Sequence, residues 1–319
     1  MSADLDFARS HLDEIREAAE RIGPHIRRTP ALTVDLDPRL VLKPECFQVT
    51  GSFKARGAFN AVLKLASDAP GVVTASSGNH AQAVALAAKA AGMPALILIP
   101  EGANPAKVAA TRALGAQVVS DGITFANRDE KLVEAKERSG YVLVHPYDDW
   151  DVIHGQGTGA LELLADAPDL AAVAVPVGGG GQISGWALAV KATNPAIQVI
   201  GVEPAAADDA FRSFRTRTLQ RLAGPANTIA DGVKTISLGA KNFEVLVERG
   251  LMDDIVTVTE PEIEAALVTA WLRCKIALEA TGALTLAAFL AGKLPAAGRI
   301  GLVLSGGNAD AALVARLLQ

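Results

Sequence analysis

One lysine stands in a setting that suits covalent chemistry better than solvation. Lys54 follows an aromatic residue and opens an apolar helix, in the segment Gly51-Ser52-Phe53-Lys54-Ala55-Arg56-Gly57-Ala58. Taken alone, it would be read as an ordinary solvated lysine at a helix start. A desolvated amine at such a position, however, can form a Schiff base with an aldehyde cofactor and can later move protons.

A run of four glycines marks a second functional segment. Gly178, Gly179, Gly180 and Gly181 lie between an apolar run typical of a buried strand and a helical pattern. Free backbone N–H groups and the positive end of a helix dipole favour anion binding at such a bend. A flexible turn or a dinucleotide loop are alternatives; the Gly-x-Gly-x-x-Gly spacing is missing, although Glu203 follows about twenty residues on. The pattern predicts a phosphate site of some kind.

Two further loops join a predicted strand to a predicted helix start. Ser76-Ser77-Gly78-Asn79-His80 follows a strand expected at 71–75, and Ser305-Gly306-Gly307-Asn308 follows one expected at 300–304. Hydroxyls and free N–H groups at these positions can bind a carboxylate, and they can equally cap a helix. Capping and binding are compatible in one loop.

An acidic segment offers ligands for a hard cation. Glu203, Asp208 and Asp209 lie within seven positions of one another, and two carboxylates with a backbone carbonyl can hold Mg²⁺, Mn²⁺ or Ca²⁺. Alternatively, Asp208 and Asp209 only open the next helix, where acidic residues are favoured. Four histidines have no metal-ligand spacing and are interpreted as surface or satisfied polar residues: His11, His25, His145 and His154.

Composition limits the class of protein. The chain has 319 residues, of which 50% are hydrophobic, so it can bury a large core and form two lobes. A net charge of -5 argues against nucleic acid or an anionic membrane as partner, and no apolar run is long enough to span a bilayer. The acidic N-terminus lacks a signal-peptide pattern, and Cys46 and Cys274 indicate neither a disulfide nor a metal site. These features favour the cytoplasm.

Short apolar runs alternate with helical patterns along the chain. A first helix is expected to end at Ile22, before Gly23-Pro24. Uniformly apolar strands separated by helices predict an α/β fold with parallel sheets covered on both faces. Strands are expected at 71–75, 95–99, 117–120, 141–144, 172–175, 199–202, 255–258 and 300–304.

Together these segments resemble the fold type II family of pyridoxal-phosphate (PLP) enzymes, in the branch of threonine/serine dehydratases, serine racemase and 3-hydroxyaspartate dehydratase. The resemblance covers nearly the whole chain. It implies a two-lobed, tryptophan synthase β-like architecture and usually a homodimer. A small α/β lobe of residues 69–147 would be inserted into a large PLP-binding lobe of residues 1–68 and 148–319, with the ligand in the cleft between them.

The resemblance also implies roles for individual residues. The cofactor would be held on Lys54, near the Phe53 ring, with its phosphate on the glycine run, its phenolic oxygen on Asn79 and its pyridine nitrogen on Ser305. Ser76, Ser77 and His80 would surround the substrate carboxylate, and in racemases the serine matching Ser77 protonates the opposite face of Cα. The metal would be held by Glu203, the Ala207 carbonyl and Asp209.

The implied reaction removes water from a small β-hydroxy amino acid and gives a 2-oxo acid and ammonia, as from L-threonine or L-serine. A 3-hydroxyaspartate dehydratase is a close alternative, because Arg128 matches a substrate-side arginine and could bind a second carboxylate. A serine or aspartate racemase is another, using Ser77. A nucleotide-dependent dehydrogenase and a non-catalytic amino-acid sensor are distant alternatives. The chain departs from its relatives at Glu279-Ala280-Thr281-Gly282, where a proline commonly follows the glutamate.

Overall fold

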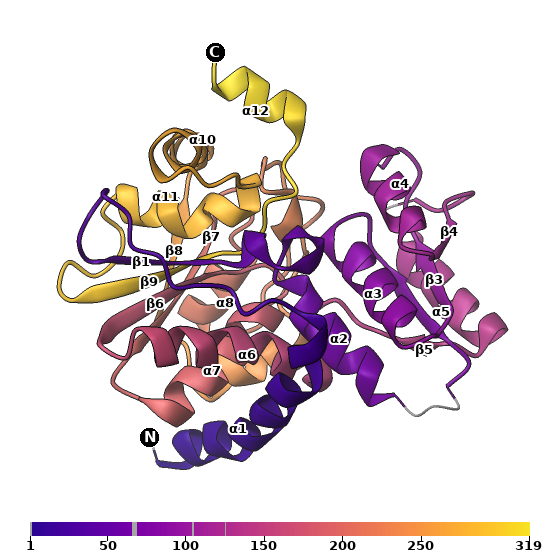
Figure 1. The fold of residues 1–319 in the computed structure, drawn as a ribbon, viewed down its shortest axis with the longest axis horizontal. Helices are drawn as coiled ribbons and strands as arrows, with labels where there is room; N and C mark the ends of the chain where they lie inside the picture. Colours follow the sequence, from indigo (N-terminus) through magenta and orange to yellow (C-terminus); the bar gives the residue numbers. More distant parts are fainter. Residues whose placement is uncertain (1, 66–68, 104, 125) are drawn as a thin grey trace.

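The fold contains two separate parallel sheets. The structure, a computed structural model, describes residues 2–65, 69–103, 105–124 and 126–319. Figure 1 shows one sheet in the larger part of the molecule and another in the smaller part on the right. The predicted α/β class with parallel sheets is confirmed.

The larger sheet has five strands in the order β1-β9-β6-β7-β8, and every neighbouring pair is parallel. Its strands come from both ends of the chain, because β1 precedes the small sheet in sequence and the other four follow it. The bounds are β1 Leu40–Pro44, β6 Leu170–Pro176, β7 Gln198–Pro204, β8 Asp254–Val258 and β9 Arg299–Leu304.

Helices cover both faces of this sheet because its strands carry apolar side chains on both sides. Val41, Val173 and Val303 belong to the core under α1, α6 and α7, whereas Leu42 and Leu302 face α10 and α11. Figure 1 shows the two helix layers on opposite sides of the strands. The bounds are α1 Ser2–Ile22, α6 Trp150–Asp166, α7 Gly181–Thr193, α10 Glu260–Thr269 and α11 Leu284–Leu290.

The smaller sheet has four parallel strands in the order β4-β3-β2-β5. Helices α2, α3 and α4 share a core with one of its faces, and α5 packs on the other. The strands are β2 Val72–Ala75, β3 Ala95–Leu98, β4 Gln117–Val119 and β5 Val142–Leu143, and the helices are α2 Lys54–Lys64, α3 Asn79–Ala90, α4 Pro105–Ala113 and α5 Arg128–Ser139. All four strands lie inside the range predicted for the small lobe; the lobe boundaries themselves stay a prediction.

Most strands expected from the sequence are present within a few residues of their predicted bounds, but β1 was not predicted. Its sequence contains Lys43 and Pro44, which are unusual in a strand interior. Lys43 is nevertheless completely buried, because its Nζ donates hydrogen bonds of 2.6 Å to Glu162 and to the Thr29 carbonyl. Proline is tolerated because β1 lies at the edge of its sheet, with β9 as its neighbouring strand and an isolated bridge from Leu42 to Leu32 on its other side.

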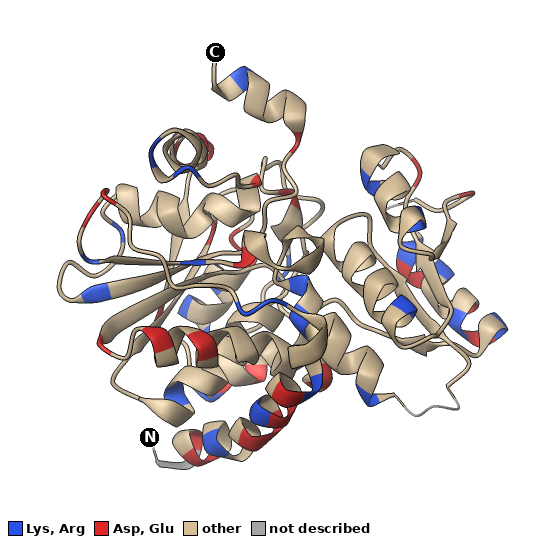
Figure 2. Cartoon of the chain, in the orientation of Figure 1, with Lys and Arg blue, Asp and Glu red and all other residues tan. Residues whose placement is uncertain are grey.

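Charged residues gather on the outer helices and loops, and the strands are nearly free of them (Figure 2). The remaining helices are α8 Asp209–Thr216, α9 Ala240–Phe243 and α12 Ala311–Leu317, and α12 projects from the rest of the ribbon in Figure 1. Among the residues described, none of the helices is both long and apolar enough to cross a membrane.

Candidate active site

Lys54 is the first residue of α2, and its amine is desolvated. Its Nζ donates a hydrogen bond of 2.6 Å to the Pro146 carbonyl oxygen and lies 5.1 Å from the centre of the Phe53 ring. The side chain as a whole is half-buried, and burial of its amine lowers the pKa from 10.5 to about 8. None of the ion pairs among the described residues involves Lys54. A sizeable fraction of this amine is therefore neutral near neutral pH, as a nucleophile requires.

The loop after β9 contacts the start of α2. The Phe53 N–H donates to the Ser305 carbonyl oxygen at 3.1 Å, and Ser52 pairs with Gly306 as an isolated antiparallel bridge. Ser305 is buried, and its hydroxyl lies 3.5 Å from the Thr281 carbonyl, at the limit of a hydrogen bond. Ser305 thus contacts Phe53, the neighbour of Lys54, although the two segments are far apart in sequence, and its hydroxyl is only loosely held. The predicted role of Ser305 toward the cofactor stays a prediction.

A buried ionic network holds the first turn of α2 in place through Arg56. Arg56 is 1% exposed and binds both oxygens of Glu45, with Nε at 2.8 Å and Nη2 at 2.9 Å. The same guanidinium donates two hydrogen bonds of 2.8 Å to Glu162, which also receives Lys43. Because Lys43 of β1 and Arg56 of α2 both bind Glu162 of α6, the network links the three elements and fixes the N-terminal turn of the helix that carries Lys54.

The segment that accepts the Lys54 amine runs from residue 145 to residue 148. His145 Nδ1 accepts the N–H groups of Tyr147, at 3.3 Å, and of Asp148, at 2.8 Å. Asp148 in turn accepts the N–H groups of Ala240 and Lys241 at the start of α9. His145 is thus a satisfied polar residue, one of the two interpretations made from the sequence. Burial, with a contribution from nearby Lys54, lowers its pKa, and its ring holds the segment that binds the amine.

The glycine run forms the turn into α7, as predicted. Gly180 precedes the helix with a φ of +95°, which favours glycine. A Cβ added at Gly179 would lie 2.3 Å from Tyr147 Cγ, and one at Gly181 would lie 2.8 Å from Tyr147 Cα. Because the glycines have no side chains, Tyr147 packs directly against the backbone of the turn. The backbone N–H groups of residues 178–181 donate to no other described residue.

Two buried polar groups near the start of α7 also lack partners. Ser184 Oγ and Gln182 Nε2 make no hydrogen bond with the described part of the chain, although both residues are more than nine-tenths buried. Unpaired buried polar atoms are costly and call for an explanation. Together with the free N–H groups and the helix dipole, they form a donor set suited to a phosphate.

The loop between β2 and α3 presents hydroxyls to the solvent side. Ser77 is exposed, and Ser76 Oγ accepts the Gly78 N–H at 3.3 Å. The ring of His80 is buried, and the predicted place of His80 beside the substrate carboxylate stays a prediction. His80 is 3% exposed, its Nε2 lies 3.0 Å from the Val144 carbonyl, and burial lowers its pKa to about 3. The neutral ring donates a hydrogen bond to the Val144 carbonyl oxygen and so links the loop to the end of β5.

Asn79 belongs to a chain of amide and carboxyl groups. Its Nδ2 donates to Glu279 Oε1 at 2.7 Å, and its Oδ1 accepts Asn308 Nδ2 at 2.7 Å. Asn308 Nδ2 also donates to the Thr50 carbonyl at 2.8 Å. Glu279 was noted in the sequence only for the missing proline beside it, and its place next to Asn79 was not predicted.

Two cations from the small-sheet side lie near residues described above: Lys107 acts on Glu279, and Arg128 acts on Tyr147. Lys107 of α4 forms an ion pair of 2.7 Å with Asp231, in the short 3-10 turn Asp231–Val233. Arg128 lies 3.4 Å from Asp129. It also lies near the Tyr147 phenol: burial raises the pKa of that phenol, and the positive charge of Arg128 partly opposes the rise. Arg128 was singled out from the sequence, whereas Lys107 was not.

The acidic segment lies at the end of β7 and the start of α8. Glu203 is 1% exposed, its Oε1 accepts the Phe211 N–H at 2.5 Å, and burial raises its pKa well above 4.5. Asp209 is 2% exposed, its Oδ2 has no partner among the described residues, and burial raises its pKa to about 7. Asp208 does not cap α8; it pairs with Arg212 at 2.9 Å.

These carboxyls do not form a large acidic cluster. The described residues contain no group of three or more His, Cys, Asp or Glu side chains placed to hold a metal. A cation here would depend on two carboxylates, the Ala207 carbonyl and water, as hard cations accept.

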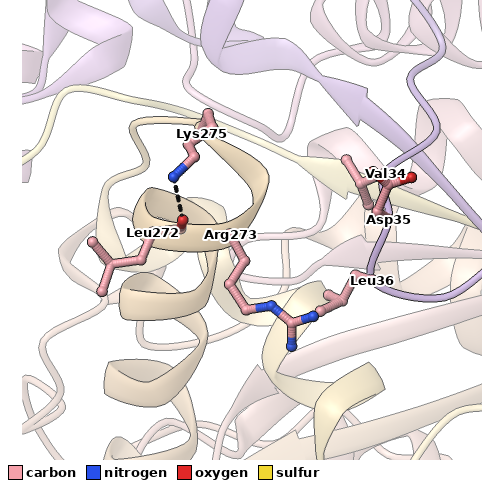
Figure 3. A pocket seen from close by; sticks show the side chains of 6 residues that line it. All are labelled: Val34, Asp35, Leu36, Leu272, Arg273 and Lys275. Carbon is pink, nitrogen blue, oxygen red and sulfur yellow. Dashed lines mark hydrogen bonds between the residues drawn. The ribbon is translucent and has the colours of Figure 1, made fainter.

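A separate pocket of about 320 Å³ lies outside this constellation (Figure 3). Its lining contains none of the residues predicted to bind cofactor or substrate. Figure 3 shows Lys275 turned back onto the Leu272 carbonyl, a bond of 2.6 Å, with Val34 and Leu36 on the facing segment. It contributes nothing to the site around Lys54.

Known proteins resemble this chain over almost its whole length. Serine racemase of Arabidopsis thaliana is 43% identical over 97% of this chain and 96% of its own length, and L-threo-3-hydroxyaspartate ammonia-lyase of Saccharomyces cerevisiae is 40% identical over 96% and 95%. The crystal structure of a serine racemase from Dictyostelium discoideum matches with a TM-score of 0.86 and 38% identity, over 94% of this chain and 98% of that one. The family model described as pyridoxal-phosphate dependent enzyme matches residues 22–306. The chain therefore belongs to the family of pyridoxal-phosphate dependent enzymes.

Proposed function

We propose that this protein is a dehydratase that removes water from a small β-hydroxy amino acid, such as L-threonine or L-serine, and releases a 2-oxo acid and ammonia. The observation that carries the proposal is the Lys54 amine, which is desolvated, free of ion pairs among the described residues and held by a carbonyl oxygen. When bound, PLP supplies an electron sink that makes the Cα–H of an amino acid acidic.

The residues present fit the cofactor. The unpaired Ser184 hydroxyl, the free N–H groups of the glycine run and the dipole of α7 provide a phosphate site. Phe53 supplies an apolar face beside the amine, and Ser305 supplies a neutral hydroxyl rather than a carboxylate for the pyridine nitrogen. A neutral partner would leave that nitrogen largely unprotonated, which would suit elimination of a β-hydroxyl group.

Lys54 then acts as the base that takes the Cα proton. Its Nζ can hold a proton and pass it on, because its pKa of about 8 lies close to neutral pH. Pro146 orients the amine through its carbonyl oxygen. Ser76 and Ser77, at the start of α3, bind the substrate carboxylate with hydroxyls and backbone N–H groups, while His80 holds the loop through Val144.

Two other reactions use the same residues. A racemase needs an acid on the face of Cα opposite Lys54, and the exposed Ser77 hydroxyl, with no hydrogen bond among the described residues, is available for it. A 3-hydroxyaspartate dehydratase needs a cation for the second carboxylate, and both Lys107 and Arg128 are near the site. The similarity to a serine racemase and to an L-threo-3-hydroxyaspartate ammonia-lyase supports testing both.

We also propose a divalent cation, Mg²⁺, Mn²⁺ or Ca²⁺, at Glu203, Asp209 and the Ala207 carbonyl. The unpaired, buried Oδ2 of Asp209 supports it, because a cation would satisfy this oxygen and remove the penalty that raises both carboxyl pKa values. The cation would be structural or activating. A homodimer in the cytoplasm, acting without nucleic acid or membrane, completes the proposal.

One experiment separates these functions. Purified protein is supplied with PLP and assayed for ammonia and 2-oxo acid from L-serine, L-threonine and both diastereomers of 3-hydroxyaspartate, with and without Mg²⁺, and for D-serine from L-serine. Lys54→Ala should lower every activity by at least about 10³-fold and remove the imine absorption band. Ser77→Ala should lower racemisation far more than elimination. Normal ammonia release by Lys54→Ala would refute the proposal.

A further inference from the structure

The carboxyl of Glu279 is a buried acid that directly contacts a predicted cofactor-binding side chain. We propose that Glu279 is a positioning residue that orients the Asn79 carboxamide toward the cofactor and exchanges a proton as it does so. The inference rests on the proposed function, and it gives the site a second titrating group besides Lys54. Asn79 and Glu279 are 200 positions apart in the sequence, and Asn79 Nδ2 donates a hydrogen bond of 2.7 Å to Glu279 Oε1.

The orientation of the Asn79 amide follows from its partners. Its oxygen accepts a hydrogen from Asn308 Nδ2, and its nitrogen donates one to Glu279 Oε1, so a flipped amide would place like groups together at both contacts. The nitrogen carries a second N–H, which has no partner among the described residues. That N–H is the donor left for the phenolic oxygen of the cofactor, and Glu279 with Asn308 sets its direction.

Close packing holds the Glu279 carboxyl in place. A Cβ added at Gly306 would lie 2.2 Å from Glu279 Oε1, and one at Gly282 would lie 2.3 Å from the Gly306 carbonyl oxygen. The Glu279 N–H also donates to that carbonyl at 3.2 Å. The glycine after Ser305 is thus required by the position of the carboxyl, because a side chain there would clash with it.

The charges around Glu279 come from several elements. Burial raises its pKa to about 7, the charge of Asp231 adds to the rise, and Lys107, Asn79 and the Asn308 N–H oppose it. The Cys46 thiol is a further titratable neighbour, with its own pKa raised to about 12 by burial and by the carboxylates Glu45 and Glu279. Near neutral pH, the thiol is therefore neutral and only the carboxyl exchanges a proton.

Ionisation of Glu279 changes the hydrogen bond to Asn79. The carboxylate accepts the Asn79 N–H through a charge-assisted bond, which is about twice as strong as a bond to a neutral acid. Protonation therefore loosens Asn79 and the donor that it offers to the cofactor. The direction and strength of the hydrogen bond that Asn79 donates therefore depend on the ionisation of Glu279. The pKa of Glu279, about 7, lies below that of Lys54, about 8.

The first test uses cofactor-free protein and needs no activity. Infrared difference spectra recorded against pH should show a protonated carboxyl signal near pH 7 that remains in Asp209→Asn, a background needed because the Asp209 pKa is also about 7, and that is missing when Glu279→Gln is added. The control is Glu262→Gln, which removes an outer carboxylate paired with Lys293 at 2.7 Å and should keep the signal. A signal near pH 7 that remains in Asp209→Asn and persists when Glu279→Gln is added would overturn the inference.

The second test leaves Glu279 intact and changes its two charged neighbours. Asp231→Asn removes a negative charge and should lower the titration midpoint, whereas Lys107→Gln removes a positive charge and should raise it, each by about half a unit. A merely structural role of these residues would not give opposite shifts. Shifts in the same direction, or none, would contradict the assignment.

The third test reads the cofactor itself. In PLP-loaded wild type, the absorption band should change through the same midpoint, with the cofactor held about three- to tenfold more weakly below it, and Glu279→Gln should remove this step. A step that persists in Glu279→Gln would refute the coupling. If the protein binds no PLP, the proposed function is wrong. The infrared titration of cofactor-free protein still shows in that case whether Glu279 exchanges a proton near pH 7.

Discussion

The Lys54 amine and the Pro146 carbonyl oxygen, 92 positions apart in sequence, lie 2.6 Å from each other. A carbonyl accepts a hydrogen bond from either an ammonium group or a neutral amine, whereas a carboxylate would stabilise the ammonium form. The protein therefore fixes the amine in space without raising its pKa. The same segment, residues 145–148, closes over the glycine turn through Tyr147, so one stretch of chain positions both the amine and the phosphate site.

The rate at which cofactor-free protein captures PLP should depend on the neutral Lys54 amine. Below pH 8, the fraction of neutral amine rises tenfold per pH unit, so the rate should rise in the same proportion and level off above about pH 8. Stopped-flow absorbance at a series of pH values measures it. A rate that keeps rising to pH 10.5 would mean that the amine titrates like a solvated lysine.

Gly179→Ala should destabilise the protein and weaken cofactor binding. The new Cβ would lie 2.3 Å from Tyr147 Cγ, and overpacking of this kind costs about 1–3 kcal/mol. Urea unfolding and a PLP titration measure the two effects. Gly224→Ala is the control, because nothing lies within 4 Å of its added Cβ. Adding Tyr147→Ala to Gly179→Ala should recover part of the lost stability, and no recovery would show that the clash is not with Tyr147.

Arg56→Met should destabilise the fold by about 3–5 kcal/mol, because it leaves buried carboxylates uncompensated. Glu45 is fully buried and receives two hydrogen bonds from Arg56. The free energy of unfolding in urea is the measurement. Arg316→Met is the control: its pair with Glu264 is exposed and should matter by less than about 1 kcal/mol. Equal effects of the two substitutions would contradict the role given to the buried network.

Asp209→Asn should abolish stabilisation by Mg²⁺. A cation that binds only the folded protein stabilises it by about 2.7 kcal/mol at a hundred times its Kd, so the wild-type Tm should rise as Mg²⁺ is added. Asp208→Asn is the matched control, because Asp208 pairs with Arg212 at 2.9 Å and has no place in the proposed ligand set. A wild-type Tm that is unaffected by Mg²⁺, Mn²⁺ and Ca²⁺ would refute the metal proposal.

Local sequence determined the elements and the chemistry at their ends. The alternation of apolar runs and helical patterns predicted the parallel α/β fold, since strands buried on both faces must be apolar throughout. Glycine, serine and asparagine after a strand predicted each functional turn, because these residues free or cap backbone N–H groups. Lys54 was recognisable for the same reason: its neighbours along the chain already indicate desolvation.

Only the tertiary structure decided which distant groups meet. Lys43 is hidden in β1 because Glu162, 119 positions away, neutralises it. His145 lies beside the amine, and Glu279 holds Asn79 from 200 positions away. Burial and hydrogen bonding between such residues depend on packing, and packing leaves no periodic trace in the sequence. The pKa values that make an amine reactive or a carboxyl able to exchange a proton are therefore properties of the folded chain.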